Sequence, residues 1–500
     1  MPSRVLLRSR ALATVGVPFL VASTIAFTFL ACSGLKSADE PAPDAGFEGG
    51  DEQTPVVVED ASVVDAAVDG AMGDAGAPPL DFECPTDPWT KAVKVKKECE
   101  PRQVKIVEMP APIDVRGISI ARTPTGRVGI VYNAEQGSET GELHLVHFTP
   151  TMPVYPPPKL VTKATGFAFH DGYETRIAAT APDTLAVLSY DMDDSSQSGE
   201  VHLRKLVAGA EPLTDALVAT GVATPTALAF GSDLAGNSVA AYRVSTGATT
   251  AKLASKQGTP AGVFTALPDL GSALRPTVAP GVGAGSIFVD PGGQFHFLYA
   301  FNDDVISPQF TTSRYHTLAG ATWSDRKTVH NNAPDGLSGF SASLAVFGTT
   351  KYAAVFFRKA GQLGVPTADL LLVSWDALLD TPKVEILDQQ IPSPDPLVPA
   401  YRVSIAVDKF GLVHLAMIIP TDDFAGLGPK NGYLEYRRQT REPGGGTKWL
   451  NDIVDPAVFA ATNQGSRASV AMVVDDNARP HIAYRSAADD SVRYATRFDR

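Results

Sequence analysis

Cysteine is scarce in this chain, which has only Cys32, Cys84 and Cys99 among its 500 residues. So few cysteines, without nearby histidines, fall short of a structural zinc ligand set. The chain also lacks a glycine-rich loop ending in Gly-Lys-Ser/Thr, a Gly-x-Ser-x-Gly turn and a His-Glu-x-x-His helix. The sequence therefore predicts no metal and no cofactor. It leans away from an enzyme but does not exclude one whose site is assembled from distant loops.

Positive charge is also in deficit, with 42 Lys and Arg against 55 Asp and Glu, for a net charge of −13. The excess of negative charge is concentrated in residues 34–83, where thirteen acidic residues accompany the single Lys36. Everything after this segment is close to neutral, which argues against nucleic-acid binding through bulk charge. The segment is rich in Ala, Asp, Gly and Pro, so it buries too little to fold. We predict a disordered tether over residues 32–83 that reaches on the order of 40 Å.

One long apolar run without charge is present, from Ala11 to Ala31, and it follows Arg4, Arg8 and Arg10. This layout is typical of a secretory signal. The run ends in Phe29-Leu30-Ala31-Cys32, which resembles a bacterial lipoprotein signal, although Phe29 stands where the best match has Leu. The resemblance implies a signal peptide over residues 1–31 and a lipid on Cys32. It also implies attachment to the outer membrane, on its periplasmic face or at the cell surface. The alternatives are an uncleaved helix of about 20 residues and an ordinary signal peptide.

In an exported protein, Cys84 and Cys99 predict a disulfide. It would clamp an entry segment, residues 84–110, and contribute about 3 kcal/mol through loop closure. Two free thiols are the alternative.

The end of the chain, residues 473–496, contains three short runs of alternating apolar and polar residues separated by Asp/Asn turns, which predicts strands. The same pattern occurs six more times upstream. Aligned on one position of the second strand, the copies recur every 52 to 67 residues at Tyr132, Tyr190, Tyr242, Tyr299, Phe356, Met417 and Tyr484. Most copies have four strand-like runs, and a single copy cannot bury its faces alone. A repeat architecture over residues 111–500 follows.

The last copy has no fourth strand before the chain ends. A strand-like run without a repeat of its own, residues 102–109, precedes the first copy. We predict that this run, near Val104, completes the last sheet and closes a ring, which removes exposed sheet edges.

Three hairpins carry a resemblance to a known repeat: Asp475 to Tyr484, with relatives at 290–296 and 408–414. They resemble the sialidase-type (BNR-like) repeat, which implies an all-β propeller. We expect seven four-stranded blades, with six as the alternative. The Ser-x-Asp-x-Gly-x-Thr-Trp box of true sialidases is absent; only the fragment Gly446 to Trp449 is present. Such propellers host hydrolases, lyases, lectins and scaffolds.

Arginines near the start of the predicted innermost strands are candidates for an anion site in a central channel, because the planar guanidinium suits carboxylates. The resemblance to sialidases, which bind a carboxylate with three arginines, implies the same use. These residues are Arg116, Arg176, Arg275, Arg402 and Arg467.

Other polar groups are weaker candidates. His296, His414 and His481 share one position in three copies and are interpreted as packed strand residues bonded to a neighbouring turn. Asp171, Tyr173 and Glu174 are the best local candidates for a hydrolase site, and the Asp pairs at 193–194 and 489–490 are interpreted as solvated turns rather than calcium ligands.

The leading functional hypothesis is therefore a membrane-anchored binding or scaffold module for a protein or glycan, expected to be monomeric. The alternative is a sialidase-like carbohydrate-active enzyme, and a role in envelope assembly is a third hypothesis.

Overall fold

The computed structural model describes a chain built from β-strands. The described residues are 102–105, 113–136, 140–150, 155–163, 169–193, 198–207, 214–223, 228–247, 250–268, 270, 285–301, 312–324, 327–330, 336–359, 367–376, 381–392, 403–421, 430–442, 445–461, 469–488 and 491–496. All of them belong to one compact unit, residues 72–500. The predicted signal, the tether and the three cysteines lie outside the described residues. Within the described ranges, no helix is long and apolar enough to cross a membrane.

The strands follow one another as antiparallel meanders, each of which corresponds to one copy of the sequence repeat. The first three meanders consist of β2 (Ile113–Arg122), β3 (Val128–Gln136), β4 (Thr140–Phe148) and β5 (Lys159–Lys163); β6 (Phe169–Ala181), β7 (Thr184–Asp193), β8 (Ser198–Val207) and β9 (Thr214–Ala223); and β10 (Ala229–Ser232), β11 (Ser238–Gly247), β12 (Thr250–Gly258) and β13 (Phe264–Ala266).

The fourth to sixth meanders continue the pattern. They consist of β14 (Ser286–Val289), β15 (Phe295–Phe301), β16 (Thr312–Ala319), β17 (Thr322–Trp323) and β18 (Lys327–His330); β19 (Gly336–Phe347), β20 (Thr350–Lys359), β21 (Thr367–Trp375) and β22 (Lys383–Pro392); and β23 (Val403–Val407), β24 (Val413–Pro420), β25 (Lys430–Arg441) and β26 (Thr447–Ala461).

The seventh meander contains both ends of the described chain. It consists of β27 (Val470–Val474), β28 (Pro480–Arg485), β29 (Val492–Thr496) and β1 (Arg102–Lys105), where β1 pairs antiparallel with β29. Val104 lies opposite Tyr494. The predicted closing strand is confirmed, with four residues of the expected eight in the described strand.

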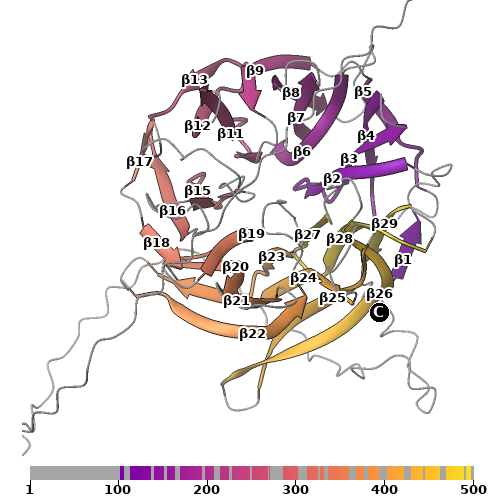
Figure 1. Ribbon diagram of the computed structural model, residues 1–500, viewed down its shortest axis with the longest axis vertical. Helices are drawn as coiled ribbons and strands as arrows, with labels where there is room; N and C mark the ends of the chain where they lie inside the picture. Colours follow the sequence, from indigo (N-terminus) through magenta and orange to yellow (C-terminus); the bar gives the residue numbers. More distant parts are fainter. Residues whose placement is uncertain are drawn as a thin grey trace, which may run out of the picture. The chain divides into compact units, whose positions relative to one another are not determined.

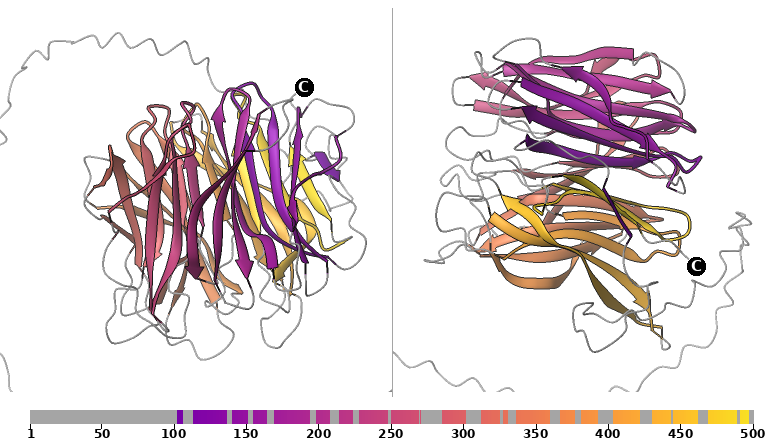
Figure 2. Two further views of the ribbon diagram at one scale, coloured as in Figure 1. Left: turned by 90° about the horizontal axis from the view of Figure 1, so that it is seen from above. Right: turned by 90° about the vertical axis from the view of Figure 1, so that its right-hand side faces the viewer.

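The first strands of the meanders surround a common axis (Figure 1). Strands β2, β6, β10, β14, β19, β23 and β27 contact one another in this order, and β27 contacts β2. Seen from the side, the strands run along this axis (Figure 2). This closed order of all-β meanders is a β-propeller, as predicted.

The sequence predicts seven, or six, four-stranded blades, and the number of hydrogen-bonded sheets differs from both. Hydrogen bonds group the described strands into five sheets, one of which has twelve strands and contains the first three meanders. The meanders merge where their edges approach: β4 and β6 share a parallel bridge at Thr140 and Phe169, and β9 meets β11 at Val222 and Val244.

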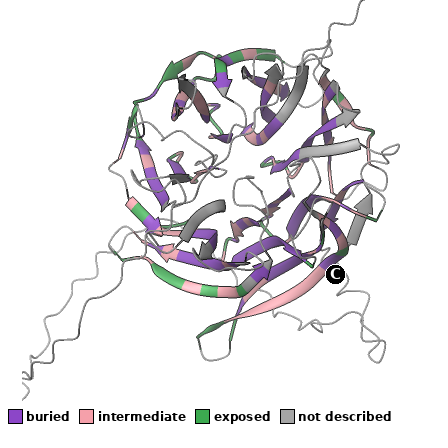
Figure 3. Cartoon of the chain, in the orientation of Figure 1, coloured by how far each residue is buried: buried purple, intermediate pink, exposed green. Residues whose placement is uncertain are grey.

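The apolar core lies between successive meanders. One cluster joins the first and seventh meanders and contains Ile118, Tyr132 and Tyr494, and similar clusters lie between each other pair of neighbours. The residues aligned by the repeat are all buried, at 3% exposure or less. Each such side chain contributes roughly 1.5–3 kcal/mol through burial. Exposure rises toward the outer strands and is clear on β22 (Figure 3).

Tight turns join the first and second strands. In the fourth meander, the amide of Gly293 donates to the carbonyl of Asp290 at 2.9 Å, and Gly293 has a φ of 80°. Glycine suits this left-handed backbone because it has no Cβ. The seventh meander has Ala478 in the same place, at a φ of 60°.

Candidate functional site

The first strands enclose a cavity of about 480 Å³, here called the axial channel. Most of its described wall is aliphatic, with Phe230 and Phe288 on one side. The charged side chains among the described lining residues are Arg122 and Arg176. The lining residues are Ile118, Ser119, Ile120, Arg122, Arg176, Ile177, Phe230, Gly285, Ser286, Ile287, Phe288, Ala342, Ser343, Leu344, Val403, Ser404, Ile405, Ala406, Val407, Val470, Ala471, Met472, Val473 and Val474.

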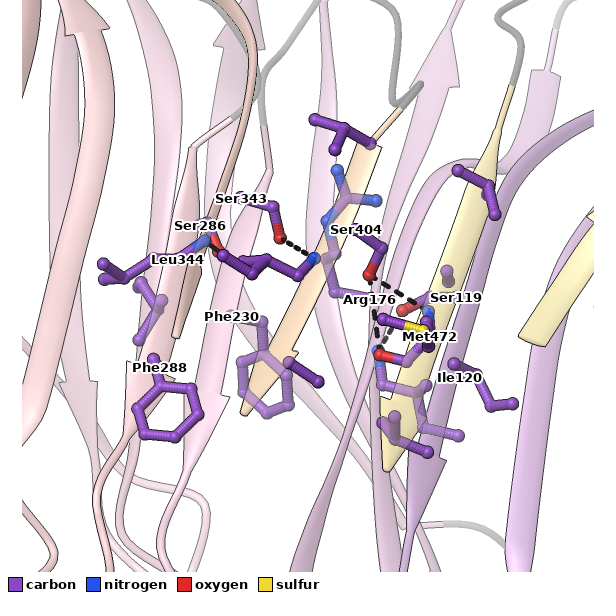
Figure 4. Close-up of a pocket in the computed structure, with 18 of the residues that line it drawn as sticks. Ser119, Ile120, Arg176, Phe230, Ser286, Phe288, Ser343, Leu344, Ser404 and Met472 are labelled. Atoms are coloured by element: carbon purple, nitrogen blue, oxygen red, sulfur yellow. Dashed lines mark hydrogen bonds between the residues drawn. The ribbon is translucent and has the colours of Figure 1, made fainter. Parts of the chain in front are cut away.

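Four serines occupy one equivalent position on the channel wall (Figure 4). The Oγ of each accepts a hydrogen bond from a backbone amide of the next first strand, since splayed neighbouring strands leave these amides without a backbone ladder. The pairs are Ser119 with Ile177 at 3.3 Å, Ser286 with Leu344 at 3.2 Å, Ser343 with Ile405 at 3.2 Å and Ser404 with Met472 at 3.0 Å. We call these residues the serine ring.

Sequence reasoning missed the serine ring, although a signal was present. Each of the four serines precedes the aligned residue of its copy by thirteen positions, as Ser119 precedes Tyr132 and Ser404 precedes Met417. Serine is common at polar positions of strands, so the pattern stands out only once the copies are aligned.

Arg176 of β6 also lines the channel (Figure 4), one residue before Ile177, which occupies the serine position in the second meander. Its Nη1 donates to the carbonyl of Thr175 at 2.6 Å, and its Nη2 lies 4.0 Å from Oε2 of Glu174. The Arg176 side chain is 14% exposed, whereas Glu174 is 1% exposed. The channel wall therefore contains a cation with a buried carboxylate 4.0 Å away.

The structure places one of the five predicted arginines, Arg176, on the channel. Arg116 lies in β2 opposite Asn133, and nothing is described of its side chain. Arg275, Arg402 and Arg467 lie outside the described residues.

Arg122, which sequence reasoning did not select, also lines the channel, at the end of β2. Its Nη1 donates to Asp476 at 3.1 Å, from the first meander to the turn of the seventh. A strand end next to a turn carries no sequence signal for a channel residue.

Of the weak hydrolase candidates, only Glu174 has a described side chain; Asp171 and Tyr173 have described backbone positions in β6. The side chains of Asp193, Asp194, Asp489 and Asp490 lie outside the described set. In the described part of the chain, no group of three or more His, Cys, Asp or Glu residues is placed to hold a metal ion.

The three repeated histidines are packed strand residues, as interpreted from the sequence. Each Nδ1 lies 2.6 Å from a tyrosine hydroxyl on the third strand, in the pairs His296–Tyr315, His414–Tyr436 and His481–Tyr494. Each Nε2 faces the turn aspartate, at 3.2 Å from Asp290, 3.2 Å from Asp408 and 3.6 Å from Asp475. These Asp–His–Tyr sets join a turn to two strands.

Electrostatics in these sets fit a structural role. Burial lowers the pKa of His296, against the effect of Asp290. Burial also raises the pKa of the Asp475 carboxyl, but the nearby His481 and the amides of Arg479 and Asn477 outweigh burial and bring this pKa down to about 2. The turn aspartate is therefore an anion held by donors.

Comparison with known proteins gives a similarity of fold only. No protein-family model and no curated protein sequence matches the chain. An α-L-arabinanase of Penicillium chrysogenum, solved with arabinobiose, has 7% identity and a TM-score of 0.42, over 79% of this chain and 97% of that chain. A GH93 α-L-arabinofuranosidase of Fusarium graminearum, also with arabinobiose, has 8% identity and a TM-score of 0.43, over 79% and 96%.

A sialidase of Trypanosoma rangeli, solved with the inhibitor DANA, has 10% identity and a TM-score of 0.36, over 65% of this chain and 58% of that chain. Similarity at this level supports no inference about activity or ligand.

Proposed function

We propose that the protein is an exported binding or scaffold module whose axial channel receives a polar group of a glycan or protein ligand. The observation that supports this proposal is the composition of the channel wall. Aliphatic side chains, the serine ring and Arg176 surround about 480 Å³, and ligand pockets of roughly 300–1,000 Å³ have apolar walls with a few placed polar groups.

The chemistry of the wall favours a ligand with oxygen acceptors. A serine hydroxyl that accepts an amide hydrogen bond retains its own proton as a donor; the hydroxyl of Ser404 directs this proton to the carbonyl of Met472 at 3.5 Å. A guanidinium has five N–H donors in a planar fork that suits carboxylates, and Arg176 directs one of them to the carbonyl of Thr175. We therefore expect acidic glycans or carboxylate-bearing peptides to bind in preference to neutral ones.

Ligand-array binding of the purified full-length protein tests this proposal. Because a hydrogen bond to a charged group contributes about 1.5–3 kcal/mol, we expect Arg176→Gln to weaken binding on the order of tenfold or more. The matched control is Arg441→Gln, since Arg441 is exposed and absent from the channel wall. Equal binding by both variants, or no binding by the parent, contradicts the proposal.

The alternative is a carbohydrate-active enzyme, favoured by the buried Glu174 beside Arg176 on a channel-lining strand. A buried carboxylate next to a cation is the kind of group that serves as a general acid or base. Incubation with acidic oligosaccharides, followed by product analysis, separates the two: turnover that is lost in Glu174→Gln supports the enzyme, and binding without turnover supports the module.

The location of the protein is part of the proposal. We propose that Cys32 carries the lipid, that residues 32–83 tether the propeller to the outer membrane, and that Cys84 and Cys99 form a disulfide. Mass spectrometry of the mature protein tests these points. An acylated Cys32 peptide and a linked Cys84–Cys99 peptide are expected; an N-terminus downstream of Cys32, or two free thiols, contradicts them.

We infer that each meander is one blade, which gives seven blades. The inference is supported by the unbroken order of first strands from β2 to β27 and by the three meanders within the twelve-stranded sheet. The self-rotation function of diffraction data is the test: sevenfold pseudosymmetry is expected, and fivefold or sixfold pseudosymmetry contradicts the count.

A further inference from the structure

The hairpin turns that join first and second strands gather on one face of the propeller, here called the turn face. Four contacts between turn regions of neighbouring meanders show this. Thr125 donates to the carbonyl of Pro182 at 3.1 Å, and Arg122 bonds Asp476 at 3.1 Å. The turns of Gly293 and Asp233 are also close, since a Cβ atom added to Gly293 would lie 3.8 Å from Asp233. In the same way, a Cβ atom added to Gly411 would lie 2.9 Å from Phe347.

The chain enters the propeller at the turn face. Arg102, the first residue of β1, lies opposite Thr496, which in turn lies opposite His481. His481 is the second residue of β28, directly after the turn that follows Val474. The chain therefore enters β1 beside the turns.

An apolar tip lies on this face in the third meander, next to the half-buried Asp233 of the same turn. The β10–β11 turn and the β12–β13 turn form this tip together. They lie so close that a Cβ atom added to Gly236 would be 3.2 Å from Pro260. Leu234 is 55% exposed and Val263 is 62% exposed. The exposed residues of the two turns are Leu234, Ala235, Thr259, Pro260, Ala261 and Val263.

A cation lies at the edge of this apolar tip. Nζ of Lys205, from the second meander, donates to the carbonyl of Pro260 at 2.7 Å. Apolar groups with a neighbouring lysine match a bilayer interface, where apolar side chains enter the headgroup region and anionic lipids attract cations.

We propose that the apolar tip docks on the surface of the lipid bilayer and turns the turn face toward the membrane. The occupant follows from where the chain enters: β1, which the chain reaches from the direction of the proposed lipid-bearing tether, begins at this face. This inference rests on the proposed lipid anchor, which would hold the propeller near the membrane. The contact of the tip with lipid is a separate interaction that does not involve the anchor. The channel end opposite the turn face is then directed away from the membrane.

A depth measurement in membranes tests the docking. The full-length protein with Leu234→Cys or Val263→Cys is labelled with an environment-sensitive fluorophore and mixed with phosphatidylethanolamine–phosphatidylglycerol vesicles containing brominated acyl chains. Leu217→Cys is the matched control, because Leu217 is 53% exposed but lies on the outer strand β9. The unsubstituted protein, labelled in the same way, gives the background from the native cysteines.

Quenching on the order of twofold is expected at both tip sites but not at position 217, because interfacial groups enter roughly 5–10 Å into the headgroup–acyl boundary. Equal quenching at positions 217, 234 and 263, or none at the tip, overturns the docking. Labelling two tip positions separately shows whether a result at one position is caused only by that substitution. Vesicle flotation and detection of the acyl group on Cys32 report separately on the anchor, so a failed anchor and a failed docking give different results.

Discussion

Val104 of β1 lies opposite Tyr494 of β29, which joins the first described strand to the last. The pairing runs from Arg102–Thr496 to Lys105–Arg493. Because the closing strand occupies the edge of β29, the ring depends on residues almost 400 positions apart.

Deletion of residues 101–110 is expected to lower the free energy of unfolding by roughly 2–4 kcal/mol, because each lost backbone hydrogen bond contributes about 0.5–1.5 kcal/mol. Urea denaturation followed by circular dichroism measures the change. The control is deletion of residues 60–69 in the predicted tether, which should leave the midpoint unchanged. An unaltered midpoint in the first deletion contradicts stabilisation by closure.

Ala478 has a φ of 60°, where the equivalent turns have Gly126, Gly236, Gly293 and Gly411. A left-handed backbone costs a residue with a Cβ roughly 1–2 kcal/mol. Ala478→Gly is therefore expected to stabilise the protein by about 0.5–1 kcal/mol, even after glycine's greater entropy in the unfolded chain.

Thermal and urea unfolding measure this gain. The control is Ala235→Gly in the turn of the third meander, since Ala235 is exposed and is not among the residues with positive φ. There, glycine should destabilise slightly. A loss of stability in Ala478→Gly of the same size as in the control would show that the left-handed backbone carries no strain.

The serine ring is expected to hold neighbouring meanders together. Ser404→Ala removes the acceptor of the Met472 amide, bonded at 3.0 Å in a part-buried position, and the loss of one hydrogen bond costs about 0.5–1.5 kcal/mol. Urea denaturation should show this loss. Ser374→Ala, at a half-buried position of β21 outside the ring, is the control; equal effects of the two changes would remove the special role of the ring.

The ionised Asp475 carboxylate should make the free energy of unfolding fall as the pH becomes acidic. Its pKa falls from an ordinary 3.8 to about 2 in the folded protein, so the stabilising effect is complete above about pH 4 and is lost as the pH falls through 2. The depressed value corresponds to about 2 kcal/mol.

Unfolding free energies at pH 7, 4 and 2.5 test this dependence. Asp475→Asn should be less stable than the parent at pH 7 by about 2 kcal/mol, with the difference shrinking toward pH 2.5. Asp476→Asn is the control, because the Asp476 side chain is 82% exposed. A difference between parent and Asp475→Asn that stays constant with pH would refute the charge effect.

The sequence by itself determined the repeat, the turns and the closing strand. Alternating residues and Asp/Gly turn chemistry act within a few positions, so copies such as that of Tyr299 and that of Tyr484 could be aligned without a structure. The roles of His296, His414 and His481 also followed, because each contacts the turn of its own hairpin.

Only the tertiary structure decided what the copies do to one another. The fusion of three meanders into one sheet depends on how closely edges such as those of β4 and β6 approach, which no local pattern encodes. The serine ring and the placement of Arg176 and Arg122 on the channel also join residues distant in the sequence. Local propensity sets the strand, whereas the neighbours of each strand are set by burial across the whole ring.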